Sequence, residues 1–265
     1  MNKNRLMMCA ALCSLFLLSG CLTAKTHSMG ASLMTVAHQP RAYSDSTNAE
    51  TSMTVNAFGS MGNGFNVENV KSGGGDVSFM YRMGGAVSPV FVTAAVGGFG
   101  GVLNFACTKD SRCDNGSLKF SDWLKTDEGK DDYSFWDVQE RILVGGDFYP
   151  GKYAIMGLGA GVQFYQGGGD YEDKRDGLEK VGYTESIEGK NGAAPVGSLW
   201  LGSRLGENGK WGSVVAEYDI RFYGNVDEWL SSAMLTYFHT SGFFGGFVWN
   251  SHLGYELNVG KTFVF

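Results

Sequence analysis

The feature that most constrains this chain is a recurring alternation of apolar and polar residues with a period of two. In the segment 134–148, Trp136 and Val138 share one parity, whereas Asp137 and Arg141 share the other. Because successive side chains of a β-strand point to opposite faces, this alternation predicts strands with one apolar and one polar face. The pattern predicts eight strands, near residues 50–60, 74–86, 89–107, 134–148, 152–167, 191–205, 211–225 and 244–265.

The connections between these strands alternate in length along the chain. Long polar connections and short turns follow one another near residues 60–73, 87–89, 108–133, 149–152, 168–190 and 206–210. A soluble sandwich has no reason to sort its loops in this way. Outer-membrane barrels do, since they carry short periplasmic turns and long extracellular loops. The order therefore predicts an all-β, antiparallel, up-and-down transmembrane β-barrel.

The polar parity carries charges of both signs in the middle of the predicted strands. These residues are Arg82, Asp137, Arg141, Glu217, Asp219, Arg221 and Glu256. Small membrane barrels fill their interior with polar side chains, and opposite charges can pair there. We therefore expect these seven residues to form a polar network in the lumen, with the apolar parity facing lipid. Glu140 falls on the apolar parity and interrupts it.

The number of strands depends on residues 227–242. The apolar residues of this segment fit a short helix in the last outer loop, which leaves eight strands. Alternatively Ser232 to His239 form a further strand, and the barrel has ten. Eight strands enclose an interior that side chains just fill, and ten loosen it only modestly. We expect no open pore in either case.

The first residues follow the order of a removable export signal. Lys3 and Arg5 precede an apolar run that is too short to span a bilayer. The run ends in Leu18-Ser19-Gly20-Cys21, which resembles the bacterial lipobox. The resemblance implies cleavage before Cys21 and acylation of that residue. The alternative is an ordinary signal peptide that is cut after Ala24.

These motifs divide the chain into three parts. Residues 1–20 are the expected lipoprotein signal peptide, 21–48 the lipidated N-terminus and tether, and 49–265 the barrel domain. The tether shows no sustained period. In an outer-membrane protein the first strand would start on the periplasmic side, and we expect the lipid on Cys21 in the inner leaflet on that side.

Once the signal is removed, Cys107 and Cys113 remain beside the lipidation site. In an exported protein, an even pair separated by five residues is typical of a small disulfide-closed loop. A metal site would need more thiol or imidazole ligands nearby, so no metal is expected, and no motif indicates a cofactor. The net charge of −6 does not indicate a positively charged surface that would bind nucleic acid.

The chain ends on an aromatic residue, Phe265, with Phe263 two positions before it. This ending resembles the terminal strand of bacterial outer-membrane barrels, which the barrel assembly machinery recognises. The whole domain resembles the small eight-stranded outer-membrane barrels of the OmpA and OmpX type. The resemblance implies an outer-membrane location, contact with membrane lipid and lipopolysaccharide, and extracellular loops that meet a surface partner.

We expect a structural or surface-interaction role and no enzymatic activity. One alternative is a lipid A-modifying enzyme, because outer-membrane lipid A deacylases carry a His-x-Ser motif with a downstream Glu. His239, Ser241 and Glu256 have this order. A His can act as a general base that activates a Ser hydroxyl as a nucleophile. However, we expect His239 in a loop and Glu256 in the lumen. The other alternative is a soluble periplasmic lipoprotein with a ligand-binding β-barrel.

Overall fold

The structure is a computed structural model, and it describes eleven stretches of the chain. These are residues 26–27, 34, 36–40, 49–63, 68–84, 90–105, 122–178, 186–187, 189–222, 230–251 and 253–265. The predicted lipidation site Cys21 and the predicted disulfide pair Cys107 and Cys113 lie outside the described residues. No helix within the described stretches is long and apolar enough to cross a membrane.

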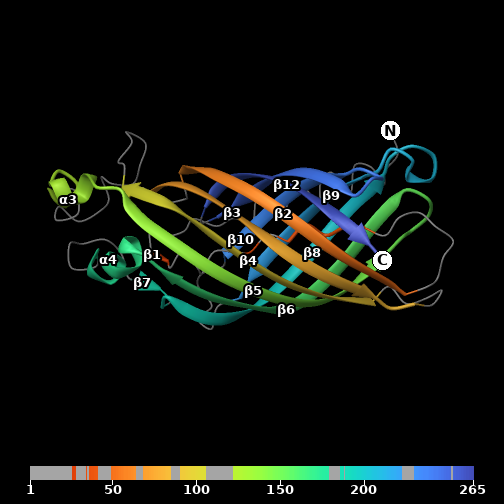
Figure 1. The fold of residues 1–265 in the computed structure, drawn as a ribbon, viewed down its shortest axis with the longest axis horizontal. Helices are drawn as coiled ribbons and strands as arrows, with labels where there is room; N and C mark the ends of the chain where they lie inside the picture. Colours follow the sequence, from red (N-terminus) through yellow and green to blue (C-terminus); the bar gives the residue numbers. More distant parts are fainter. Residues whose placement is uncertain are drawn as a thin grey trace, which may run out of the picture.

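Ten antiparallel strands form one closed barrel (Figure 1). They are β2 (Glu50–Asn63), β3 (Glu68–Arg82), β4 (Val90–Phe105), β5 (Tyr133–Phe148), β6 (Ala154–Gly168), β8 (Asn191–Arg204), β9 (Ser213–Arg221), β10 (Leu230–Phe238), β11 (Phe243–Asn250) and β12 (Gly254–Val264). Each barrel strand pairs with the next barrel strand along the chain, and β12 closes on β2. The predicted all-β antiparallel barrel is confirmed, with the ten strands that were its alternative.

The count of eight strands is wrong, and the last segment explains why. The predicted strand 244–265 contains two strands, because the chain reverses between Asn250 and Gly254. The Asn250 side chain accepts a hydrogen bond from the Leu253 N–H (3.2 Å), and Gly254 has a φ of +81°. Residues 230–238 form β10 rather than a helix.

The two ends of the barrel differ in their connections. At one end, called here the turn end, the strands are joined through residues 83–89, 149–153, 205–212 and 239–242, and both Glu50 and Val264 lie there. At the opposite end, called the loop end, the two long connections span residues 106–132 and 169–190. Two of the three predicted long connections are therefore present at one end.

The predicted long connection at 60–73 is wrong. Only four residues separate β2 from β3, and the glycines Gly73, Gly74 and Gly75 lie within β3. A glycine-rich polar stretch is typical of a loop, but here the glycines permit close approach of neighbouring strands. A Cβ on Gly74 would overlap the carbonyl oxygen of Gly98 on β4.

The two long connections carry short elements that pack together at the loop end (Figure 1). They contain α3 (Asp127–Lys130), α4 (Asp170–Leu178) and β7 (Ser186–Ile187), which pairs in parallel with β1 (Thr26–His27). Lys174 of α4 forms an ion pair with Glu128 of α3. The Tyr133 hydroxyl donates to the Glu128 carbonyl (2.6 Å). These contacts make a folded cap rather than two independent loops.

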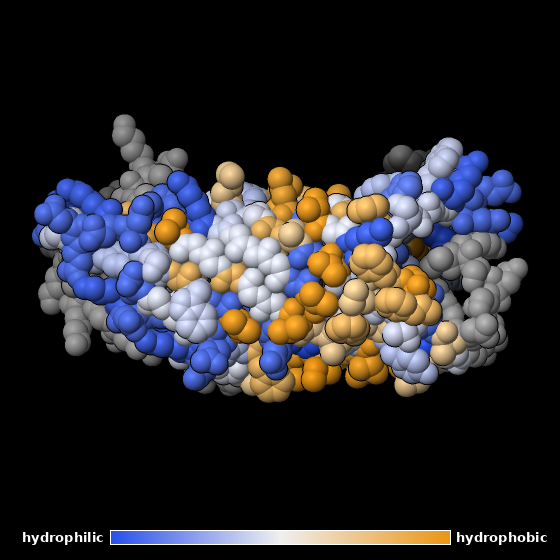
Figure 2. All heavy atoms as spheres, viewed as in Figure 1, coloured by the Kyte–Doolittle hydropathy of each residue, from blue (hydrophilic) through white to orange (hydrophobic). Residues whose placement is uncertain are grey.

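The outer wall of the barrel is apolar around its middle (Figure 2). Large exposed side chains come from nine of the strands; examples are Val55, Phe79, Val96, Ile142, Leu158, Leu199, Leu235, Phe247 and Leu257. Leu257 and Leu158 are 67% and 60% exposed. They belong to a set of exposed apolar side chains that is larger than a soluble monomer usually carries. These large exposed side chains therefore point outward from the wall.

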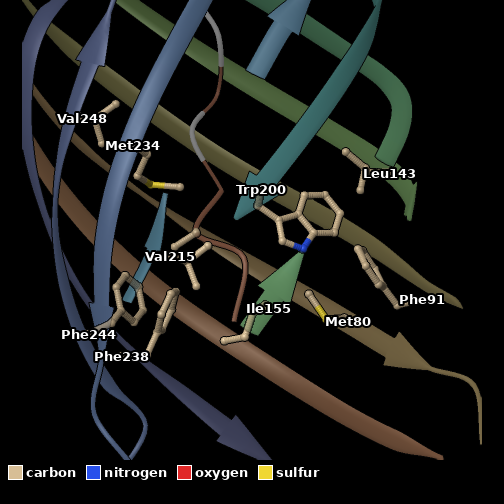
Figure 3. Close-up of a cluster of buried hydrophobic side chains, with 11 residues drawn as sticks. Met80, Phe91, Leu143, Ile155, Trp200, Val215, Met234, Phe238, Phe244 and Val248 are labelled. Atoms are coloured by element: carbon tan, nitrogen blue, oxygen red, sulfur yellow. The ribbon is translucent and has the colours of Figure 1, made fainter. Parts of the chain in front are cut away.

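The interior has an apolar cluster near each end and polar residues between them. Near the loop end the cluster includes Phe99, Leu103, Tyr133, Phe135 and the α4 residue Tyr171. Towards the turn end lies a second cluster, which includes Ala37; its larger side chains are shown in Figure 3. It contains Met80, Phe91, Leu143, Ile155, Trp200, Val215, Met234, Phe238, Phe244 and Val248. The lumen is therefore packed with side chains over much of its length.

Candidate functional site in the barrel lumen

Part of the predicted tether lies inside the barrel. Met34 and Val36 to Pro40 are described; all of them except Gln39 are buried, and Gln39 is partly so. Their partners belong to wall strands more than forty residues away in sequence. We call residues 34 and 36–40 the lumen segment. It belongs to the folded structure, whereas the sequence assigned it to a tether.

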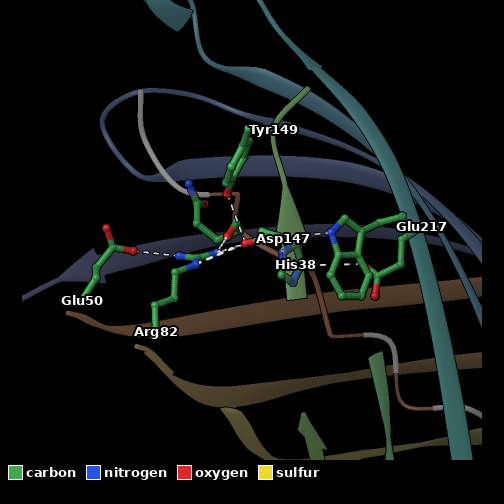
Figure 4. A network of polar contacts seen from close by, with 8 residues as sticks. His38, Glu50, Arg82, Asp147, Tyr149 and Glu217 are labelled. Atoms are coloured by element: carbon green, nitrogen blue, oxygen red, sulfur yellow. Dashed lines mark hydrogen bonds and ion pairs between the residues drawn. The ribbon is translucent and has the colours of Figure 1, made fainter. Parts of the chain in front are cut away.

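His38 is a buried side chain of the lumen segment with polar and aromatic partners. Its Nε2 lies 2.7 Å from Oδ1 of Asp147, and its backbone N–H donates to Oε2 of Glu217 (3.3 Å). The imidazole stacks on Trp200 with ring centroids 4.1 Å apart, and it lies 4.9 Å from the Phe91 ring. The ring therefore lies against two aromatic side chains, and it also contacts the Asp147 carboxylate (Figure 4).

Asp147 gathers several donors around one buried carboxylate. The Trp200 Nε1–H donates to Oδ1 (3.0 Å), and the Tyr149 hydroxyl donates to Oδ2 (3.1 Å). Arg82 donates to the same Oδ2 from Nε (3.3 Å) and Nη2 (3.2 Å). A buried carboxylate is stable only when such partners compensate for its lost hydration. Asp147 is therefore the point where β3, β5, β8 and His38 are joined.

Arg82 also links the lumen segment to the start of the barrel. Its Nη1 donates to Oε1 of Glu50 (2.7 Å), the first residue of β2, and its Nη2 donates to the carbonyl of Gln39. Arg82 thus bridges two carboxylates, Glu50 and Asp147, and one backbone oxygen (Figure 4).

A second guanidinium holds the other end of the lumen segment. Arg141 forms a two-point ion pair with Asp219, with Nη1–Oδ2 at 2.7 Å and Nη2–Oδ1 at 3.2 Å. Its Nη1 also donates to the Met34 carbonyl (2.8 Å), and the Met34 N–H donates to Oε1 of Gln163 (3.0 Å). The Arg141 Nη2 donates to the Ser198 hydroxyl as well.

The seven residues predicted for the lumen are all buried on the interior side of their strands. Arg82, Arg141, Asp219 and Glu217 are brought together around the lumen segment. Arg221 lies farther toward the loop end, with its guanidinium carbon 4.6 Å from the centre of the Tyr165 ring. Asp137 and Glu256 lie on β5 and β12.

The interior leaves little free space beside the lumen segment. One cavity near Met34 and another near His38 each have a volume of about 20 Å³. Such a cavity holds about one water molecule. A larger cavity of about 500 Å³ opens at the turn end, where Gln39, Pro40 and Glu50 line it. We call this cavity the vestibule. The lumen segment lies between the vestibule and the packed interior.

Sequence reasoning missed the lumen segment and the grouping at Asp147. The available signal was the mainly apolar stretch from Leu33 to Ala37, followed by His38, inside the tether. Asp147 lies on the same parity as Asp137 and Arg141 in β5, and this placed it on the polar face. The contact between Asp147 and Trp200 could not be predicted, because the position of Trp200 in its own strand does not show which residue it contacts.

Glu140 lies on the outer wall in the middle of β5, where it is exposed. Its register neighbours on β4 and β6 are Val96 and Phe164, which are also exposed. Within the described residues, no hydrogen bond or ion pair to its carboxylate is present. The interruption seen in the sequence is thus an outward-facing carboxylate among apolar side chains.

His239 and Ser241 lie in the four-residue turn between β10 and β11, and both are exposed. Nδ1 of His239 lies 2.7 Å from the Ser241 hydroxyl and also accepts the Ser241 N–H (3.2 Å). Glu256 is buried on the lumen face of β12, and the described residues show no contact between it and His239. The Ser–His contact is therefore local to one turn at the turn end.

Phe263 and Phe265 lie at the end of the chain, on the outer side of the turn end. They are 38% and 77% exposed, and the Phe265 N–H donates to the Thr51 carbonyl (2.9 Å). Phe263 also lies beside Lys261, whose ammonium is 5.1 Å from its ring centre.

No group of three His, Cys, Asp or Glu side chains that could hold a metal ion occurs in the part of the chain that the structure describes.

Comparisons with known proteins give a structural likeness but no match to a family model or to a curated protein. Among solved structures, the translocator domain of the autotransporter NalP from Neisseria meningitidis is similar, with 12% sequence identity. The match covers 83% of this chain and 88% of that chain, with a TM-score of 0.37.

Proposed function

We propose that this chain is an integral outer-membrane β-barrel protein with a lipid anchor at Cys21. Its role is structural or one of surface interaction, carried out through the cap at the loop end. The single observation that carries the proposal is the apolar outer wall (Figure 2), which combines with a charged interior. This arrangement is the reverse of a soluble protein, whose apolar side chains point inward.

The size of the wall fits a bilayer. Strands β4 and β5 each have 16 residues, and β2 and β8 have 14. At about 3.3 Å per residue and a tilt of about 40°, such strands rise roughly 35–40 Å. The hydrocarbon core of a bilayer is about 30 Å thick. These four strands are long enough to cross it.

The same wall argues against a soluble periplasmic lipoprotein. Soluble monomers rarely expose contiguous apolar patches larger than a few hundred Å². Here, large apolar side chains surround the barrel, and aromatic residues such as Trp136, Phe148 and Phe243 lie nearer its ends. A protein with such a surface would aggregate in water, whereas in a bilayer the lipid chains cover the apolar wall.

The filled lumen supports a role other than passive diffusion of solutes. The lumen segment occupies the middle of the barrel, and Arg82 and Arg141 bind its carbonyl groups. The apolar cluster near the loop end fills the space beyond it. The parts of the molecule left to meet partners are the wall and the cap formed by α3 and α4. Lipopolysaccharide around the barrel and the assembly machinery acting on Phe263 and Phe265 are the partners we propose.

The experiment is fractionation of a Cys21→Ala protein that is exported with a conventional signal peptide. Membranes are washed with carbonate, and gel mobility is compared before and after boiling. We expect the variant to remain in the outer-membrane fraction and to change mobility on boiling. Release as a soluble protein would contradict the proposal and would favour a soluble barrel with an internal ligand. The unsubstituted chain, processed in parallel, controls for export.

A further inference from the structure

The described N-terminal residues lie at three levels of the barrel. Thr26–His27 pair with Ser186–Ile187 in the β6–β8 connection, at the loop end (Figure 1). Met34 lies at mid-height, where it contacts Arg141 of the wall. Pro40 lines the vestibule at the turn end. In the direction of the sequence, the chain therefore runs from the loop end to the turn end.

The length of this segment allows one passage through the lumen and excludes two. Pro40 follows Thr26 by fourteen positions in the sequence. At most about 3.6 Å per residue, they reach roughly 50 Å. Along its longest strands, β2 to β6 and β8, the wall is about 35–40 Å tall. A path that entered and returned through the same end would need nearly twice that height. The segment thus crosses the barrel once, and β2 begins at Glu50 on the turn end.

We propose that the mature N-terminus is displayed on the cell surface and that the lipid on Cys21 enters the outer leaflet. The inference rests on the proposed function, because it requires lipid modification of Cys21 and a loop end that faces outward. Cys21 precedes Thr26 by five residues, which reach at most about 18 Å. This length is about half the height of the wall. The lipid therefore inserts beside the cap, whereas the sequence alone indicated the inner leaflet on the periplasmic side.

The contacts of the lumen segment hold this arrangement in place. Withdrawal of the segment would leave Asp147 without its partner His38. It would also leave the guanidinium groups of Arg82 and Arg141 without the carbonyl groups of Gln39 and Met34. Leaving buried charged groups without partners costs free energy. The contacts with the barrel wall therefore oppose withdrawal of the lumen segment. Thr26 and His27 then stay at the loop end.

The first test is cysteine labelling of intact cells with a membrane-impermeant maleimide. In a background with Cys107→Ser and Cys113→Ser, one cysteine is introduced by Thr26→Cys. Two matched variants report the two ends: Lys130→Cys in α3 and Glu207→Cys in the turn between β8 and β9. Lys130 and Glu207 are both exposed. We expect Thr26→Cys and Lys130→Cys to be labelled on intact cells, and Glu207→Cys only after permeabilisation.

The outcomes separate the inference from the function on which it rests. If Lys130→Cys is labelled on intact cells but Thr26→Cys is not, the threaded path is wrong and the proposed orientation survives. If Lys130→Cys is labelled only after permeabilisation, the orientation fails and the outer-leaflet placement fails with it.

A second measurement follows the lipid itself. A specific protease site is inserted between Ala24 and Lys25 in cells grown with labelled palmitate, and the protease is added outside intact cells. Both native cysteines of the barrel are retained, so this measurement does not depend on their replacement. We expect the barrel to lose its palmitate label. Retention of the label on intact cells, with loss after permeabilisation, would overturn the inference.

Discussion

His38 and Trp200 stack in the lumen with ring centroids 4.1 Å apart and planes inclined by 25°. Both side chains also lie within hydrogen-bond distance of the same Asp147 oxygen, at 2.7 Å and 3.0 Å. One partner comes from the N-terminal segment and the other from β8 of the wall. The relationship makes the lumen segment a structural part of the barrel.

The variant His38→Ala should lower the free energy of unfolding by about 2–3 kcal/mol. It removes a hydrogen bond to a buried carboxylate, typically worth about 1.5–3 kcal/mol, together with an aromatic contact. The measurement is denaturant unfolding in detergent or lipid vesicles. His239→Ala, in the exposed turn between β10 and β11, is the matched control and should change little. Equal effects of the two variants would show that His38 has no anchoring role.

Removal of one partner of the Arg141–Asp219 ion pair should lower the free energy of unfolding more than removal of both partners. Arg141→Met leaves Asp219 buried without its guanidinium, which costs about 3–5 kcal/mol for a buried pair. Arg141→Met combined with Asp219→Leu should be less destabilised than Arg141→Met alone. A thermal-unfolding double-mutant cycle measures this coupling. Additive losses would contradict a direct pair.

Glu140→Leu should stabilise the barrel in a bilayer by about 1 kcal/mol. Glu140 faces outward between Val96 and Phe164, and a carboxylate on the lipid face carries a modest cost. Reversible unfolding from lipid vesicles measures the change, and Glu207→Leu in a water-exposed turn is the control. A lower stability for Glu140→Leu would mean that the carboxylate has a favourable partner in the membrane.

Gly74→Ala should be more destabilising than Gly59→Ala. A Cβ at Gly74 overlaps backbone atoms of Gly98 and Phe99, so β3 and β4 must move apart, at about 1–3 kcal/mol. A Cβ at Gly59 meets its nearest atom, the Ser72 carbonyl oxygen, at 3.9 Å. Unfolding midpoints of the two variants make the comparison. If both variants shift equally, close strand approach does not explain the glycines of β3.

Much of the wall could be predicted from the sequence because strand side chains alternate strictly. The parity of β5 placed Trp136 and Val138 on one face and Asp137 and Arg141 on the other, and the structure has the same division. Strand number was harder to predict. The alternation continues through Asn250 and His252, so the reversal before Gly254 left no break in the pattern.

The lumen segment could not be predicted in the same way. Its residues have no regular period, and their partners lie more than forty positions away in sequence. The chain also needs apolar residues inside the barrel, such as Phe91 and Trp200, which the simple division into polar and apolar faces does not anticipate. Packing around a threaded segment produces these positions, and no local pattern specifies it.

The most direct test of the account is a spin-label scan along β5 in lipid vesicles. Single cysteines at Val138, Ile142 and Val144 test the outer wall, and those at Gln139 and Leu143 test the lumen face. We expect high accessibility to oxygen and low accessibility to a polar nickel chelate at the first three positions, and low accessibility to oxygen at the other two. Nickel accessibility at Val138, Ile142 and Val144 equal to that of a water-exposed turn such as Glu207 would contradict a wall that faces lipid.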